Sequence, residues 1–164
     1  MTTKDSTALE RFRRAQSSDT AGFVAARAEL LAGRKIGHWM WYIFPQLKGL
    51  GESEFSRLYA VRDCDEAIAY LSDPVLGNRL VELTELVDAK LRQGIRLETL
   101  FDGSIDARKL VSSLTLFDLA AQKGRAEGFP FLREGFILRC AVVLAAAERE
   151  GFERCLYTVS HVTL

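Results

Sequence analysis

The strongest constraint on the fold is an apolar repeat of three and four residues in the middle of the chain. Five residues lie at these intervals: Leu76, Leu80, Leu83, Val87 and Leu91. This spacing places their side chains on one face of an α-helix. Asp73 can cap the start of that helix and Pro74 can occupy its first turn. The sequence therefore predicts an amphipathic helix that buries this face against the rest of the protein.

The same period recurs in two later segments of the chain. The first contains Leu110, Leu114, Phe117 and Ala121, after Ser104 and Asp106, and the second contains Phe136, Cys140, Val143, Leu144 and Ala147. Both segments should form helices that pack inward.

Four shorter helices are predicted, over residues 8–16, 20–32, 53–59 and 64–71. Gly33 can end the second, and Asp63 and Glu66 can form a capping box at the start of the last. Residues 39–44 are aromatic enough to be extended, yet they do not alternate and have no hairpin partner. Residues 123–128 are typical of an exposed loop. We therefore predict one compact all-α domain of about seven helices over residues 1–164, with residues 1–7 as a flexible N-terminus.

Length and charge restrict the class of protein. A chain of 164 residues with 48% apolar content is long enough for one self-sufficient core. The 22 basic and 22 acidic side chains cancel, so the overall charge draws the protein to neither nucleic acid nor an anionic membrane. Residues 1–7 lack the apolar core of a secretory signal, and the apolar run 141–147 is far shorter than the roughly 20 residues of a membrane span. Cys64, Cys140 and Cys155 are widely spaced, which is typical of reduced thiols. We expect a cytoplasmic protein without membrane contact.

Several familiar sites are excluded by their spacing. The chain has no Gly-x-x-x-x-Gly-Lys-Ser/Thr phosphate loop and no Gly-x-Ser-x-Gly nucleophile elbow. Gly49 and Gly51 lack the third glycine of a dinucleotide fingerprint, because Glu54 stands in its place. The two histidines, His38 and His161, are too far apart for a local metal motif. We expect no cofactor and no metal, and the sequence assigns no reaction.

The most unusual chemistry lies in residues 38–46, which read His-Trp-Met-Trp-Tyr-Ile-Phe-Pro-Gln. The rings of Trp39 and Trp41 can stack on a base or a sugar, His38 can exchange a proton near neutral pH, and Gln46 can read a polar edge. These residues could line a pocket. Alternatively, the rings form the core of a helical domain and His38 is a hydrogen-bonded structural imidazole.

Two further groups extend this candidate site. Gly49 and Gly51 allow close approach of the backbone, and if Ser53 caps the next helix, the free amides at its start would favour an anion. On a later helix, Lys109 can converge with Ser112 or Ser113, as a base or an anion clamp. Alternatively, the two serines bond to preceding backbone carbonyls or to neighbouring helices.

Several strings together resemble one bacterial family. They are residues 38–46 with Gly49-Leu50-Gly51 and Ser53, then Tyr59-Ala60-Val61, Ala69-Tyr70-Leu71, Pro74-Val75-Leu76-Gly77 with Arg79-Leu80, and Lys109-Leu110 with Ser112-Ser113 and Thr115-Leu116-Phe117. The chain is similar over residues 8–117 to the domain-of-unknown-function family 1810 (DUF1810). The resemblance implies a single, mainly α-helical domain and no established activity. Some members carry the label calpastatin, which does not fit a compact, unrepeated chain. After Phe117 the sequence departs from the family pattern.

Three hypotheses for function remain open from the sequence. The first is a site for a small anionic or nucleotide-like ligand, built on residues 38–53 and closed by Lys109 and Ser112 or Ser113. The second is a protein-interaction or structural module, including a homo-oligomer, in which the aromatic run is core. The third, binding of nucleic acid through the arginines near the N-terminus, is disfavoured by the neutral charge.

Overall fold

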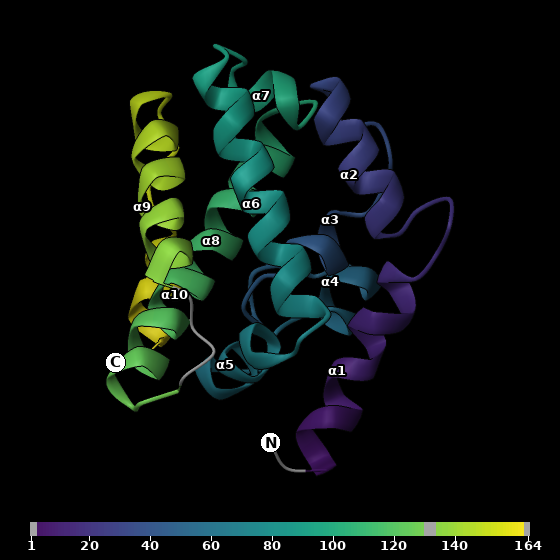
Figure 1. Cartoon of the computed structure of the whole chain (residues 1–164), viewed down its shortest axis with the longest axis vertical. Helices are drawn as coiled ribbons and strands as arrows, with labels where there is room; N and C mark the ends of the chain where they lie inside the picture. Colours follow the sequence, from purple (N-terminus) through teal and green to yellow (C-terminus); the bar gives the residue numbers. More distant parts are fainter. Residues whose placement is uncertain (1–2, 130–133, 163–164) are drawn as a thin grey trace.

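The chain folds into a helical assembly in which two long helices, α6 and α8, position most of the others (Figure 1). A computed structural model describes residues 3–129 and 134–162. Its ten helices are α1 (Thr3–Gln16), α2 (Phe23–Ala32), α3 (Met40–Ile43), α4 (Glu54–Leu58), α5 (Cys64–Ser72), α6 (Leu76–Arg92), α7 (Leu97–Leu100), α8 (Ser104–Ala126), α9 (Glu134–Arg149) and α10 (Leu156–His161). The described residues form no β-strand, only an isolated parallel bridge between Leu47 and Val61.

The prediction of an all-α fold is confirmed, but the predicted number of about seven helices is too low. The helices that the sequence did not predict are α3, α7 and α10, which have four, four and six residues. A helix of one or two turns is too short to show a repeat of three and four residues, so the apolar periodicity could not predict these three helices. In α3, the structure turns residues 40–43 into a helix instead of an extended segment.

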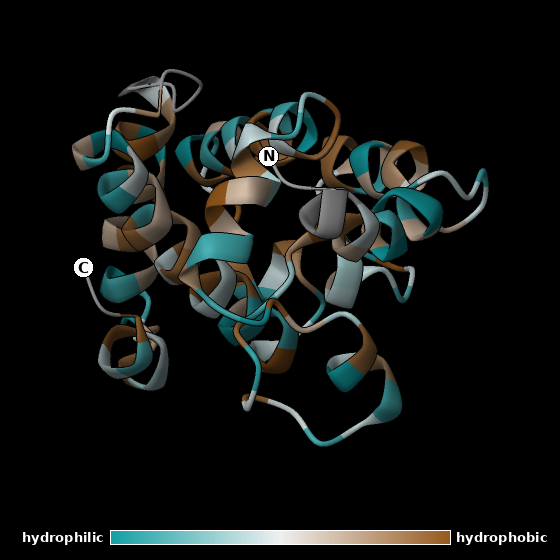
Figure 2. Ribbon diagram, turned by 90° about the horizontal axis from the view of Figure 1, so that it is seen from below, coloured by the Kyte–Doolittle hydropathy of each residue, from teal (hydrophilic) through white to brown (hydrophobic). Residues whose placement is uncertain are grey.

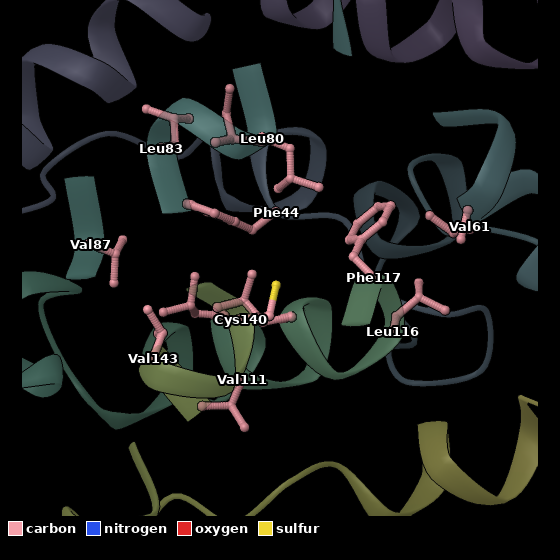
Figure 3. Close-up of a cluster of buried hydrophobic side chains, with 14 of the residues drawn as sticks. Phe44, Val61, Leu80, Leu83, Val87, Val111, Leu116, Phe117, Cys140 and Val143 are labelled. Carbon is pink, nitrogen blue, oxygen red and sulfur yellow. The ribbon is translucent and has the colours of Figure 1, made fainter. Parts of the chain in front are cut away.

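Helix α6 buries the face that the apolar repeat predicted. Leu80, Leu83 and Val87 are at most 1% exposed. Helices α9 and α2 pack against different sides of α6 (Figure 1). Helix α5, which precedes α6 in the chain, contacts both α6 and α8. Figure 3 shows these α6 side chains facing Cys140 and Val143 of α9, with Phe44 between the layers. The apolar repeat is therefore the face by which α6 packs into the core.

Helix α8 is buried on more than one face, from Ala107 to Gly124. It contacts α3, α5, α7, α9 and α10. A helix that is apolar on several sides lies inside a bundle rather than on its surface. Figure 2 shows the same division, with hydrophobic ribbon turned inward and hydrophilic ribbon on the outer faces of the surrounding helices. Helix α8 is therefore the element against which distant segments are placed.

The predicted caps of α6 and α2 are present. The Asp73 carboxylate accepts hydrogen bonds from the backbone N–H groups of Val75 and Leu76, at 3.0 and 2.9 Å, before α6. Gly33 ends α2 in the left-handed region, with φ of 86°. Such bonds satisfy groups that the ends of a helix leave unpaired.

At α5, half of the predicted capping box is formed. The Asp63 carboxylate accepts a hydrogen bond from the Glu66 N–H at 2.9 Å. The Glu66 carboxylate, however, accepts from the Arg62 N–H at 2.6 Å and pairs with Arg11 of α1. The Glu66 side chain thus joins two helices, which no local pattern reveals.

Three predicted boundaries are corrected. Residues 20–22 precede α2, because its first helical residue is Phe23. The predicted loop 123–128 is helical as far as Ala126, so α8 is longer than its apolar repeat. Helix α1 already includes Thr3–Thr7, whereas residues 1–2 of the predicted flexible N-terminus lie outside the described residues.

Candidate functional site

The aromatic run divides between the core and a cleft. Trp39 is fully buried, and its indole Nε1 donates a hydrogen bond of 2.8 Å to the Glu29 carboxylate of α2. The ring also contacts Phe44 and Phe101 at centroid distances of 6.4 and 6.5 Å. The structure therefore places Trp39 in the hydrophobic core, in agreement with the alternative interpretation of the run.

Glu29 holds the segment before α3 in place. Besides Trp39, its carboxylate accepts hydrogen bonds from the backbone N–H groups of Ile36 and Gly37, at 2.7 and 2.9 Å. Partial burial raises the pKa of Glu29, but these three bonds and the nearby charge of Lys35 outweigh it and lower the pKa below its ordinary value. The carboxylate is therefore charged at neutral pH and fixes this loop.

Lys35 and Asp106 connect this loop to the first turn of α8. The Lys35 Nζ, on a side chain that is 5% exposed, lies 2.7 Å from the Asp106 carboxylate and donates to the Gly37 carbonyl at 2.6 Å. Lys109 pairs with the other Asp106 oxygen at 2.8 Å. Burial raises the pKa of Asp106, but the hydrogen bonds from Lys109 and Lys35 outweigh this effect. The pKa of Asp106 therefore lies below its ordinary value. One carboxylate thus positions two lysines.

A cleft of about 720 Å³ lies between α3, the segment 46–56, the first two turns of α8 and the segment before α10. Its lining residues are Trp41, Gln46, Leu50, Gly51, Glu52, Ser53, Ser56, Ile105, Arg108, Lys109, Val111, Ser112, Gly151, Phe152, Glu153 and Cys155. Cavities of about 300–1,000 Å³ are usual for small-molecule sites.

Six of the ten residues predicted for a ligand site line this cleft: Trp41, Gln46, Gly51, Ser53, Lys109 and Ser112. The other four, His38, Trp39, Gly49 and Ser113, are not among its lining residues. His38 is exposed, outside the cleft, and Ser113 is fully buried inside the bundle. The tertiary structure therefore brings together α3, the segment 46–53 and α8, whose proximity the sequence could only suggest.

The indole of Trp41 lines the cleft, but its ring is already packed against neighbouring side chains and is not free to stack on a ligand. Phe55 stacks on it at a centroid distance of 5.4 Å and an interplanar angle of 29°. The Lys109 ammonium lies 4.8 Å from the ring centroid, a favourable cation–π geometry. A planar ligand could stack on this ring only by displacing one of these neighbours.

The glycines of the turn are required by packing. Gly49 has φ of 102°, and a Cβ at this position would lie 2.0 Å from the Tyr157 hydroxyl. That hydroxyl donates a hydrogen bond of 3.1 Å to the Lys48 carbonyl. A Cβ on Gly51 would lie 2.6 Å from the Ser56 Cβ. Neither glycine is explained by a ligand.

Ser53 caps α4, as predicted. Its hydroxyl accepts a hydrogen bond from the Ser56 N–H at 3.1 Å. The amide is therefore already paired, and α4 has only five residues.

The two serines of α8 differ in their surroundings. Ser112 is 4% exposed and lines the cleft, while Ser113 is 0% exposed and does not. Within the described residues, neither hydroxyl has a hydrogen-bond partner, in contrast to Thr115, whose hydroxyl donates to the Val111 carbonyl at 2.7 Å. Neither hydroxyl therefore bonds to a preceding carbonyl or to a neighbouring helix in the described part of the chain, which the alternative interpretation had expected.

Sequence reasoning missed Arg108 and Cys155 as parts of the site. Arg108 adjoins Lys109, and this pair of basic residues was the only available signal. Cys155 directly precedes α10 and lies against α8. Its backbone N–H donates a hydrogen bond of 3.3 Å to the Thr115 hydroxyl. No spacing in the sequence joins these two segments.

The charges of the cleft are mixed. Arg108 and Lys109 are basic, whereas Glu52 and Glu153 are acidic. Lys109 pairs with Asp106, a carboxylate that it shares with Lys35, but we find no ion pair for Arg108 in the described part of the chain. Arg108 is therefore the cation of the cleft that remains available for an anionic group.

Cys155 has an unusual environment for a thiol. Partial burial opposes its ionisation, but the hydroxyls of Ser112 and Thr158 and the backbone N–H groups of Thr158 and Tyr157 favour the thiolate. The balance lowers the pKa of Cys155 below its ordinary value. In contrast, burial raises the pKa of both Cys64 and Cys140.

Other features of the described residues bear on cofactors and membranes. Over residues 3–129 and 134–162, no group of three or more His, Cys, Asp and Glu side chains is placed to hold a metal ion. In the same ranges, no helix is both long and apolar enough to span a lipid bilayer.

Comparison with known proteins finds one family and one solved structure. Residues 6–130 match the family described as "Protein of unknown function (DUF1810)". The crystal structure of the conserved hypothetical protein Rv1873 from Mycobacterium tuberculosis is 36% identical, with a TM-score of 0.77 over 95% of this chain and 96% of that chain. No curated protein matches. Cys155, which lines the cleft, lies beyond the segment that the family matches.

Proposed function

The chain belongs to the DUF1810 family, whose function is unknown, and we propose from its geometry that it binds a small anionic, nucleotide-like molecule in the cleft. The observation that carries this proposal is the convergence of six predicted site residues, from segments far apart in the chain, on one cavity of about 720 Å³. Core packing alone gives no reason for polar groups from three segments to face one hollow.

The charges in the cleft define the chemistry of the ligand. Arg108 offers a guanidinium that can bind a phosphate or carboxylate through two parallel hydrogen bonds. Glu52 and Glu153 can accept hydrogen bonds from hydroxyl or amino groups. A molecule that combines an anionic group with such donors, as nucleotides and sugar phosphates do, complements both.

Gln46 and the apolar residues would set the orientation of the ligand. Gln46 is half-buried, and its side chain amide can both donate and accept. Phe152 and Leu50 supply an apolar surface for the uncharged part of the ligand. The indole of Trp41, which stacks on Phe55, lines the same cleft.

A thermal-shift screen with nucleotides, sugar phosphates and dicarboxylates tests this proposal. A ligand should raise the melting temperature, and calorimetry should then give its affinity. Arg108→Ala should weaken binding by about tenfold or more, since a hydrogen-bonded ion pair contributes roughly 1.5–3 kcal/mol. The matched control is Arg14→Ala on α1, an arginine that is 82% exposed and away from the cleft.

Two results would contradict the proposal. One is a screen in which no compound of these classes stabilises the protein. The other is a ligand whose affinity is the same for the wild type, Arg108→Ala and Gln46→Ala, because that ligand would bind elsewhere.

A further inference from the structure

We propose that Cys155 is a redox site, at which a hydroperoxide oxidises the thiolate to a sulfenic acid. The sulfur attacks one oxygen of the peroxide, so that an S–O bond forms while the O–O bond breaks. The departing alkoxide or hydroxide takes a proton from water. The sulfur loses two electrons, and the hydroperoxide is reduced to an alcohol or to water. This reaction needs no bound ligand and is independent of the function proposed above.

The first observation is the position of the sulfur. Cys155 lines the cleft and is only half-buried, so a small oxidant can reach it. The cleft of about 720 Å³ also has room for an organic substituent, for which Ile105 and Phe152 provide apolar contacts. Cys64 and Cys140, in contrast, are buried and do not line the cleft.

The second observation is a pair of hydroxyl groups beside the sulfur. Ser112 is 4% exposed and Thr158 is 0% exposed, and neither hydroxyl has a hydrogen-bond partner within the described residues. Both nevertheless lie close enough to the Cys155 sulfur to favour its thiolate. A buried hydroxyl without a partner is unfavourable, so its retention calls for an explanation.

An oxygen bonded to the sulfur would explain both hydroxyls. Neither hydroxyl forms a hydrogen bond to the thiol, whereas an oxygen bonded to the sulfur offers each of them an acceptor. Ser112 lines the cleft, so it also faces the direction from which the oxidant arrives. The same hydroxyls that leave the thiol form incompletely bonded would thus bond to the sulfenic acid.

The environment favours both the start and the product of this reaction. Despite partial burial, the nearby hydroxyls and the backbone N–H groups of Thr158 and Tyr157 lower the pKa of Cys155, and the thiolate is the form that attacks peroxides. Within the described residues, no second cysteine lines the cleft to convert the product into a disulfide. The sulfenic acid should therefore accumulate.

The test uses the reduced full-length chain, treated with hydrogen peroxide or cumene hydroperoxide in the presence of dimedone. Mass spectrometry then quantifies the dimedone adduct on each of the three cysteines. Cys155 should be labelled at least about tenfold faster than Cys64 and Cys140, because its thiolate is both more populated and more accessible. Faster labelling with cumene hydroperoxide would identify an organic hydroperoxide as the preferred oxidant, and faster labelling with hydrogen peroxide the smaller one.

Two adjacent serines provide a matched pair of variants. Ser112→Ala should slow the labelling of Cys155 several-fold, whereas Ser113→Ala should leave it unchanged. Both serines are buried and lack hydrogen-bond partners within the described residues, but Ser113 lies outside the cleft. A general effect of losing a buried hydroxyl would appear in both variants.

Three results would overturn the proposal. The first is labelling of Cys64 or Cys140 as fast as that of Cys155. The second is a Cys155 that reacts with iodoacetamide but gives no dimedone adduct with either peroxide. The third is an equal rate for wild type and Ser112→Ala. The first two are measured on the wild type and do not depend on the folding of any variant.

Discussion

The Lys35 ammonium and the Asp106 carboxylate form an ion pair of 2.7 Å between the loop before α3 and the first turn of α8. Asp106 also holds Lys109, which lies over the indole of Trp41 at the cleft. The aromatic run therefore belongs to two environments at once. Trp39 is anchored in the core, whereas Trp41 lines the cleft, where Asp106 holds Lys109 over its ring.

Replacing Lys35 should destabilise the protein. Lys35→Ala leaves Asp106 half-buried with one cation fewer and removes the donor to the Gly37 carbonyl. Breaking a buried pair costs about 3 kcal/mol in the free energy of unfolding. Urea denaturation measures this change. Lys48→Ala, on an exposed lysine of the following loop, is the control and should change stability by less than about 0.5 kcal/mol.

Glu29 should make stability depend on pH in the acidic range. Its pKa in the folded protein is below the ordinary value, so the unfolded chain binds a proton more readily. The contribution of Glu29 is therefore fully present above the unfolded pKa of about 4.3 and is lost as the pH falls through the lower folded pKa. Thermal melts between pH 7 and pH 3 should show a steeper loss for the wild type than for Glu29→Gln.

The same variant should be less stable at neutral pH. A glutamine keeps one acceptor oxygen, but the N–H groups of Ile36, Gly37 and Trp39 all bond to one charged oxygen. Losing the charge should lower the free energy of unfolding by about 1–3 kcal/mol. Equal stability of Glu29→Gln and wild type at pH 7 would show that the loop does not depend on this carboxylate.

A side chain at Gly49 should disrupt the turn. Gly49→Ala combines an unfavourable φ of 102° with a Cβ placed 2.0 Å from the Tyr157 hydroxyl. The expected loss is more than the roughly 1 kcal/mol that a positive φ alone costs. Gly94→Ala separates the two effects, because Gly94 has φ of 86° and open space around it. If both variants lose the same stability, the contact with Tyr157 is unimportant.

The two tryptophans should differ in fluorescence. Trp39 is fully buried, whereas Trp41 is partly exposed in the cleft. A Trp41→Phe variant, in which Trp39 alone emits, should have blue-shifted emission and little quenching by acrylamide. A Trp39→Phe variant should be quenched more strongly, and a ligand of the cleft should change only its emission. Equal quenching of the two variants would contradict this division of the aromatic run.

Local sequence determined the helices and much of their burial. The repeat from Leu76 to Leu91 predicted α6, and Asp73, Gly33 and Ser53 predicted helix ends, because caps and apolar stripes depend on neighbours three or four residues away. The same reasoning missed α3, α7 and α10, whose one or two turns show no period. It also ended α8 too early, because Lys123–Ala126 carries no apolar stripe.

Only the tertiary structure decided which residues share the cleft. The sequence placed Trp39 and Trp41 in one run, but α3 turns the first into the core and the second toward the cavity. It gave no reason to join Ser112 to Cys155, since these residues are brought together by the packing of α10 against α8. Hydrogen bonds and apolar periods act within a few residues, whereas a site is formed where segments far apart in the chain are packed together.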